Sequence, residues 1–216
     1  MPLGRPPSLR AHVFICVAIL SRFADWMDLT WLSVMLKPVP VSILLVGVLQ
    51  WANLGRPRTL VACGLALGIV GDVLLEWPAD LFLPGLVAFL VSHLCYIGAF
   101  VAQERAPATR WLLLYAGLGA AVFGSLAPEL EQMMLPVAVY VVVIVGMAWR
   151  AGALLGRVAG GGAAVLGASL FLLSDSMLAY NRFHTAFPLA SEAVMASYWA
   201  AQFWIARSVI VRAECP

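Results

Sequence analysis

The chain has 216 residues, of which 63% are apolar and 11% are charged, and its mean hydropathy is +0.95. A soluble domain carries about a quarter charged residues, and a disordered chain combines low hydrophobicity with high net charge, so this composition excludes both classes. A membrane-spanning helix needs about 20 apolar residues, which leaves room for eight such helices but not for a separate soluble domain. The net charge of +2 gives no indication of partners, and we expect a lipid bilayer rather than nucleic acid around the chain.

Long apolar runs follow one another along the chain, separated by short polar segments. They cover residues 9–24, 30–51, 59–77, 81–102, 111–127, 133–150, 160–180 and 190–211. The runs are too long, and alternate too little between polar and apolar residues, to be the strands of a transmembrane barrel. The sequence therefore predicts an all-α polytopic membrane protein with eight transmembrane helices in one bundle, residues 1–216 forming a single integral membrane domain.

The first run, 9–24, allows two interpretations. A basic start with Arg5 and Arg10, followed by a short apolar core, could be a signal peptide. No convincing small-residue cleavage site follows it, so we favour a retained first helix.

Positive charge is distributed unevenly over the two sides of these eight helices. With the N-terminus in the cytoplasm, ten arginines fall on the cytoplasmic side and two, Arg22 and Arg182, on the other. The cytoplasmic set is Arg5, Arg10, Arg56, Arg58, Arg105, Arg110, Arg150, Arg157, Arg207 and Arg212. Cytoplasmic loops of membrane proteins carry an excess of Lys and Arg. We therefore expect both the N- and C-termini in the cytoplasm, and the short loops favour a bacterial inner membrane.

Four ionisable residues, Lys37, Asp72, His93 and Asp175, lie at membrane depth in these runs. A charged side chain there is costly and is a functional hypothesis by default. Three of them also have a structural interpretation: Lys37 could extend to the interface, Asp72 could form an ion pair with Lys37, and His93 could be a packing residue. Two aspartates at matched depth on separate helices favour a joint functional role.

Further polar side chains are expected to face the same interior, although each could instead be an interfacial aromatic or a helix–helix hydrogen bond. They are Tyr96, Tyr140, Ser174, Tyr198 and Gln202. Tyr96 follows His93 by three residues and so shares its helix face. With alternating helix directions, most of these groups fall in the outer half of the membrane, with His93 and Gln202 near its middle. This convergence predicts a cavity open toward the non-cytoplasmic side.

Elimination narrows the chemistry of such a cavity. A zinc hydrolase needs three ligands, but the three histidines lie far apart along the chain and the four cysteines show no ligand spacing. A serine triad lacks any Gly-x-Ser-x-Gly context. We expect no metal and no cofactor. A pair of carboxyls at low dielectric can supply an acid beside an ionised base, which suits acid-catalysed opening of an acetal-like or enol-ether bond through an oxocarbenium ion.

The sequence resembles the YhhN family of integral membrane proteins, which includes the animal lysoplasmalogenases. The resemblance spans residues 30–206 and rests on the order and spacing of several short strings. They are Lys37-Pro38, Gly71-Asp72-Val73-Leu74-Leu75, Pro84-Gly85-Leu86-Val87-Ala88-Phe89 continuing to His93 and Tyr96, Leu135-Pro136 with Tyr140, Gly167-Ala168-Ser169-Leu170-Phe171 leading to Ser174-Asp175, and Tyr198 with Gln202.

The resemblance implies a hydrolase that cleaves the vinyl ether bond of lysoplasmalogens, releasing a fatty aldehyde and glycerophosphocholine or glycerophosphoethanolamine. One aspartate, Asp72 or Asp175, would protonate the vinyl ether, and the other would stabilise the oxocarbenium ion and orient or deprotonate water. Lys37 would bind the phosphate of the lysophospholipid head group. The histidine and the tyrosines would orient glycerol and water.

Three alternatives remain open at the level of the sequence, and one of them is a purely structural membrane protein. The same site could hydrolyse another lysophospholipid or ether lipid. Alternatively, Asp72, His93 and Asp175 could form the relay of a proton-coupled transporter. The sequence shows no inverted repeat and no paired broken helices, which argues against a transporter. It makes no prediction of oligomeric state.

Overall fold

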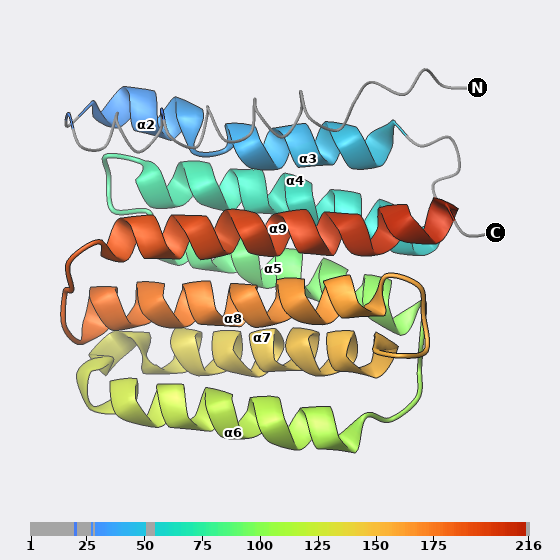
Figure 1. Ribbon diagram of the computed structural model, residues 1–216. Helices are drawn as coiled ribbons and strands as arrows, with labels where there is room; N and C mark the ends of the chain where they lie inside the picture. Colours follow the sequence, from blue (N-terminus) through green and yellow to red (C-terminus); the bar gives the residue numbers. More distant parts are fainter. Residues whose placement is uncertain (1–19, 21–26, 28, 51–54, 215–216) are drawn as a thin grey trace.

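The computed structural model describes residues 20, 27, 29–50 and 55–214, and every regular element in those ranges is helical (Figure 1). The α-helices are α2 (Thr30–Leu36), α3 (Val39–Leu49), α4 (Arg56–Glu76), α5 (Phe82–Val101), α6 (Thr109–Leu126), α7 (Met134–Leu154), α8 (Gly161–Phe183) and α9 (Ala190–Glu214). Two 3-10 turns, η1 (Ala127–Glu129) and η2 (Glu131–Met133), connect α6 to α7.

The helices confirm the predicted all-α membrane architecture in its coarse form. Within the described ranges, six segments are long and apolar enough to cross a membrane, with α2 and α3 counted as one. The 25-residue helix α9 is less apolar because it carries polar residues such as Tyr198 and Gln202. Seven predicted runs, from residue 30 onward, coincide with helices. Nearly all of the first predicted run, 9–24, lies outside the described residues.

Prolines interrupt the first described span. Helix α2 ends at Leu36, and α3 begins at Val39 with Pro38 at its N-cap and Pro40 in its first turn. Proline has no backbone N–H and its ring clashes with the preceding turn, so a helix cannot continue through it undisturbed. The break leaves Lys37 between two short helices, where it is 8% exposed.

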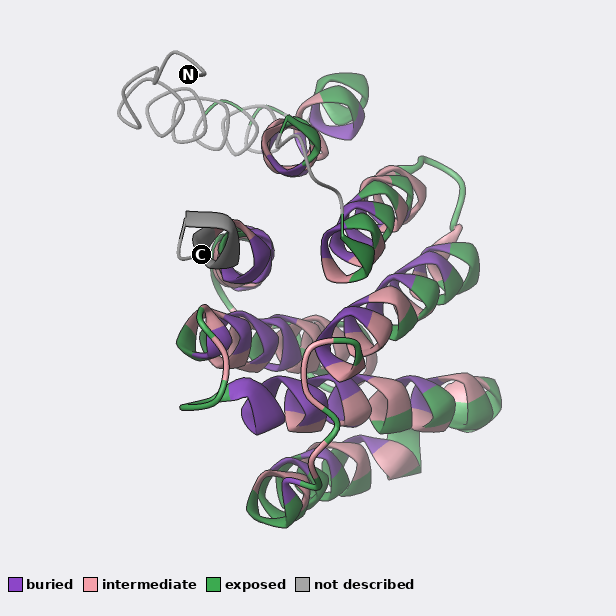
Figure 2. Cartoon of the chain, turned by 90° about the vertical axis from the view of Figure 1, so that its right-hand side faces the viewer, coloured by how far each residue is buried: buried purple, intermediate pink, exposed green. Residues whose placement is uncertain are grey.

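The long helices lie side by side in one bundle, with α9 between α4 and α8 and with α6 at one edge against α7 (Figure 1). Buried residues gather where helices face one another, and exposed residues lie on the outside (Figure 2). The outside carries large apolar side chains, including Leu113, Leu135 and Val142, which are 69%, 72% and 71% exposed. A soluble protein rarely exposes so much apolar surface, whereas lipid tails solvate it.

Glycines bring α4 close to its neighbours. A Cβ atom on Gly68 would lie 2.8 Å from Nε2 of Gln202, and one on Gly71 would lie 2.6 Å from the ring of Phe89. Small residues allow membrane helices to approach closely, since without a hydrophobic driving force their association depends on packing and hydrogen bonds. The glycines of α4 therefore make room for the side chains that α5 and α9 direct at it.

We expect Gly71→Ala to lower the stability of the folded bundle by about 1–3 kcal/mol, the usual cost of overpacking. The Phe89 ring is confined by edge contacts with Phe171 and Tyr198, at centroid distances of 6.2 and 5.6 Å, so it cannot move aside easily. The matched control is Gly117→Ala on α6, where an added Cβ meets nothing within 4 Å. Thermal unfolding in detergent measures both, and equal midpoints for the two variants would contradict the packing argument.

Candidate active site

The polar residues at membrane depth form two clusters, both anchored on α5. His93 and Tyr96 are fully buried on that helix. His93 contacts side chains of α7 and α8, whereas Tyr96 bonds to α9. One helix therefore contributes a residue to each cluster.

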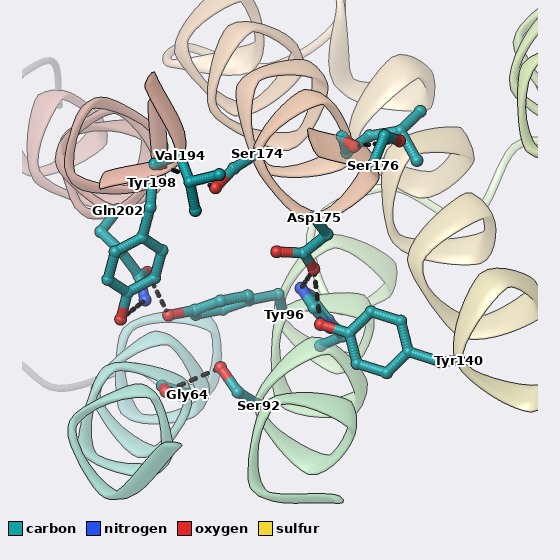
Figure 3. A network of polar contacts seen from close by, with 12 residues as sticks. Gly64, Ser92, Tyr96, Tyr140, Ser174, Asp175, Ser176, Val194, Tyr198 and Gln202 are labelled. Atoms are coloured by element: carbon teal, nitrogen blue, oxygen red, sulfur yellow. Dashed lines mark hydrogen bonds and ion pairs between the residues drawn. The ribbon is translucent and has the colours of Figure 1, made fainter. Parts of the chain in front are cut away.

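The first cluster surrounds Asp175 of α8 (Figure 3). The hydroxyl of Tyr140 on α7 donates a hydrogen bond to Oδ2 of Asp175 at 2.5 Å. Nε2 of His93 lies 3.9 Å from the same oxygen. The His93 ring packs edge-on against Phe171 and Tyr140, at centroid distances of 4.5 and 5.3 Å. Neither ring nitrogen of His93 has a hydrogen-bond partner among the described residues.

The second cluster is a chain of hydrogen bonds that ends at Asp72 of α4. Tyr96 donates to Oε1 of Gln202 at 2.7 Å, and Nε2 of Gln202 donates to the hydroxyl of Tyr198 at 3.1 Å. That hydroxyl donates to Oδ2 of Asp72 at 3.0 Å. All four side chains are buried, so the chain connects α4, α5 and α9 and supplies each of these groups with a partner.

Aromatic rings lie between the two clusters. The Phe171 ring contacts His93 of the first cluster and Tyr198 of the second, the latter at a centroid distance of 5.4 Å. Asp72 and Asp175 each bond to a different tyrosine and have no hydrogen-bond partner in common among the described residues. The expectation of a single carboxyl pair facing one cavity therefore differs from the structure, in which each aspartate belongs to its own helix contact.

A pocket opens beside Asp175, with an empty volume of about 690 Å³ that includes its open mouth. Its polar lining comes from Tyr140, Asp175 and Ser176, and the rest of the wall is apolar. The apolar wall consists of Leu75, Phe82, Leu86, Phe89, Gly119, Val122, Leu126, Val137, Val141, Ile144, Leu172, Leu178, Ala179 and Phe183. The Asp175 side chain remains 16% exposed. Asp72 is not among the lining residues of this pocket, so the first cluster is the one that supplies the pocket with an acid.

Three other polar residues take positions that the sequence does not determine. The ammonium of Lys37 forms an ion pair with the carboxylate of Glu76, and both interact electrostatically with Asp72. Ser174 donates to the backbone oxygen of Val194 at 2.9 Å and so ties α8 to α9. Ser176, which was not among the residues selected from the sequence, is the serine that lines the pocket.

The described residues bring together no group of three or more His, Cys, Asp or Glu side chains that could hold a metal ion. The pocket wall itself carries the carboxyl of Asp175, the phenol of Tyr140 and the hydroxyl of Ser176, and the buried imidazole of His93 lies behind Asp175. These groups can transfer protons to and from a bound ligand.

Comparison of the sequence with known proteins identifies related proteins. The model described as the YhhN family matches residues 32–209. Lysoplasmalogenase TMEM86B from Homo sapiens is 35% identical over 185 residues, which are 85% of this chain and 77% of that protein. Lysoplasmalogenase TMEM86A from Homo sapiens is 34% identical, over 86% of this chain and 81% of that protein. A lysoplasmalogenase from Mycobacterium bovis is 32% identical, over 84% and 73%. No solved structure matches the chain at a significant level.

We expect Lys37→Met alone to destabilise the bundle by about 3 kcal/mol, because it leaves the carboxylate of Glu76 partly buried without its counter-ion. The double variant Lys37→Met/Glu76→Gln removes both charges and should recover most of that loss. A double-mutant cycle of thermal unfolding in detergent measures the coupling. Additive effects of the two single substitutions would show that the ion pair contributes nothing to stability.

Proposed function

The chain belongs to the YhhN family, and we propose that it is a lysoplasmalogenase whose reaction takes place at Asp175 in the pocket between α5, α6, α7 and α8. Relatives named for that activity in animals and in mycobacteria align with most of the chain. The observation that carries the proposed site is the position of Asp175, a carboxyl held by Tyr140 on the wall of an otherwise apolar pocket. Such a pocket suits a lysophospholipid with one hydrocarbon chain.

The proposal includes the membrane topology. Eight helices form one domain over residues 1–216, and both termini face the cytoplasm of a bacterium whose inner membrane holds the protein. The ten-to-two distribution of arginines supports this orientation. The pocket then belongs to the non-cytoplasmic half of the membrane, because Asp175 lies in the second half of α8, which runs outward.

Proton transfer from Asp175 starts the reaction. In its acid form, Asp175 donates its proton to the outer carbon of the vinyl ether, and the double-bond electrons form the new C–H bond. The ether oxygen shares the positive charge of the adjacent carbon in an oxocarbenium ion. The carboxylate that remains is negative and close to that cation, and Tyr140 stabilises the carboxylate by its hydrogen bond.

Water then adds to the cationic carbon, and the proton that the water loses passes through the carboxylate of Asp175 to His93, which lies behind Asp175 and does not line the pocket. The imidazole suits this role because its nitrogens have no hydrogen-bond partner among the described residues and Nε2 lies 3.9 Å from Asp175. The hemiacetal returns its hydroxyl proton to Asp175 as the bond between its carbon and the glycerol oxygen breaks. Protonated His93 supplies, by way of Asp175, the proton that the glycerol oxygen takes up. One water is consumed, an aldehyde leaves, and both residues regain their starting protonation.

Asp72 has a positioning role in this mechanism. It holds Tyr198, which in turn accepts a hydrogen bond from Gln202, and Gln202 binds Tyr96 on α5. His93 lies on the same helix as Tyr96. By holding α5 in place, the second cluster therefore fixes the position and orientation of His93 relative to Asp175. The second aspartate therefore acts through the placement of α5 and touches no substrate.

We expect Asp175→Asn to reduce aldehyde release from a lysoplasmalogen by at least about a hundredfold, the usual contribution of a general acid. The matched variant, Asp72→Asn, keeps a polar group at the end of the hydrogen-bond chain and should retain activity within about tenfold of the unaltered protein while losing stability. Detergent-purified protein, assayed with and without a chelator, gives both rates. Loss of activity in Asp72→Asn with full activity in Asp175→Asn would reverse the assignment. No aldehyde from folded, unaltered protein would point to another lipid substrate.

The pocket itself can be tested from α6. Val122 lines the pocket, so Val122→Phe should lower kcat/KM for a long-chain lysoplasmalogen roughly tenfold, or about 1.4 kcal/mol. Leu118 lies one turn earlier on the same helix and is 47% exposed, and Leu118→Phe is the control for a phenylalanine that faces lipid. Equal rates in the two variants would show that the ligand does not occupy this space.

A further inference from the structure

An exposed ion pair stands beside one end of the pocket, where the rings of Phe82 and Phe183 meet edge to face at 5.6 Å. Nη2 of Arg182 lies 2.8 Å from Oδ2 of Asp80, and the two side chains are 46% and 70% exposed. The guanidinium of Arg182 is 5.0 Å from the centre of the Phe82 ring. The backbone N–H of Phe82 donates to Oδ1 of Asp80 at 3.3 Å. Phe82 thus fixes both charges next to the pocket that it lines.

Helix geometry relates this pair to the proposed acid. Arg182 follows Asp175 by seven residues on α8, which is two turns, about 10 Å along the axis and about 20° around it. The two residues therefore share one face of the helix. Side chains of a helix lean toward its N-terminus, so the side chain of Arg182 extends back toward the turn that carries Asp175.

The spacing corresponds to the polar part of a lysophospholipid. Five single bonds separate the sn-1 ether oxygen from the phosphorus atom, and at about 1.5 Å per bond they span about 6 Å when extended. With the ether at Asp175, the phosphate reaches the level of the Arg182 side chain. The hydrocarbon chain then extends away from Arg182 along apolar lining residues such as Ile144 and Leu172, and Leu172 precedes Asp175 by about one turn of α8.

We propose that Arg182 and Asp80 bind the zwitterionic head group of the lipid substrate, with Arg182 on the phosphate and Asp80 on the ammonium. The inference rests on the proposed function and specifies the orientation of its substrate. The planar guanidinium matches phosphate oxygens, and the carboxylate matches a cationic amine. An exposed ion pair contributes little to stability, so both groups can exchange their partners for the head group at little cost.

The assignment replaces the phosphate site that the sequence suggested at Lys37. That ammonium is buried in an ion pair with Glu76, and neither residue lines the pocket. A phosphate at Lys37 would have to compete with a carboxylate in a poorly solvated place. Arg182 is more accessible, and it stands on the helix that carries the acid.

Binding of saturated ether analogues tests the proposal apart from catalysis, because they have no double bond to protonate. We would measure dissociation constants in detergent for 1-O-hexadecyl-glycerophosphoethanolamine, 1-O-hexadecyl-glycerophosphate and 1-O-hexadecylglycerol. Arg182→Gln should weaken binding of both phosphate-containing analogues about tenfold and leave 1-O-hexadecylglycerol unchanged. Asp80→Asn should weaken the phosphoethanolamine analogue but not the glycerophosphate analogue. Arg157→Gln makes the same charge change in the α7–α8 loop and is the control.

Several outcomes would overturn the head-group assignment. Arg182→Gln could leave all affinities unchanged, or it could weaken all three analogues equally. Asp80→Asn could weaken both phosphate-containing analogues equally. Aldehyde release by the unaltered protein is measured separately. A protein that binds as expected but releases no aldehyde would refute the proposed reaction and keep the head-group site. A protein that releases aldehyde but shows no head-group discrimination would refute the head-group site and keep the proposed reaction.

Discussion

A polar side chain inside a membrane bundle must find its partner within the protein, and this requirement organises the structure. Asp72 meets it completely, through a chain of hydrogen bonds that reaches Tyr96 on a third helix. Asp175 meets it with one short hydrogen bond from Tyr140. His93 does not meet it among the described residues. Within the two clusters, Asp175 and His93 have the fewest partners, and they lie at or behind the pocket wall, where a ligand or water can supply what the protein does not.

The helices follow from the sequence because length and apolarity are local properties. The break at Pro38 is equally local, since it results from the chemistry of one residue. The polar site residues could be selected in the same way, because an ionisable or hydrogen-bonding group is conspicuous in an apolar run. The hydrogen bond between Tyr96 and Gln202 links two of the residues selected on that ground.

The separation of the two aspartates could not be predicted from the sequence. Position along a helix gives depth in the membrane, and Asp72 and Asp175 were matched by depth. Their lateral positions depend on which helices touch, and that depends on contacts such as the one between Gly71 and the Phe89 ring. The ion pair of Arg182 with Asp80 also could not be predicted, because its partners are 102 residues apart and meet only through helix contacts. The sequence placed Arg182 only on one side of the membrane.

Helix α6 stands apart from the polar clusters. It lies at the edge of the bundle, packs mainly on α7 and forms one wall of the pocket with Gly119, Val122 and Leu126 (Figure 1). The members of the two clusters come from α4, α5, α7, α8 and α9. Substitutions on the inner face of α6 therefore reshape the pocket without altering any hydrogen bond of the clusters. Relatives that share the same acid, phenol and imidazole can diverge in the lipids they accept through the evolution of a single peripheral helix.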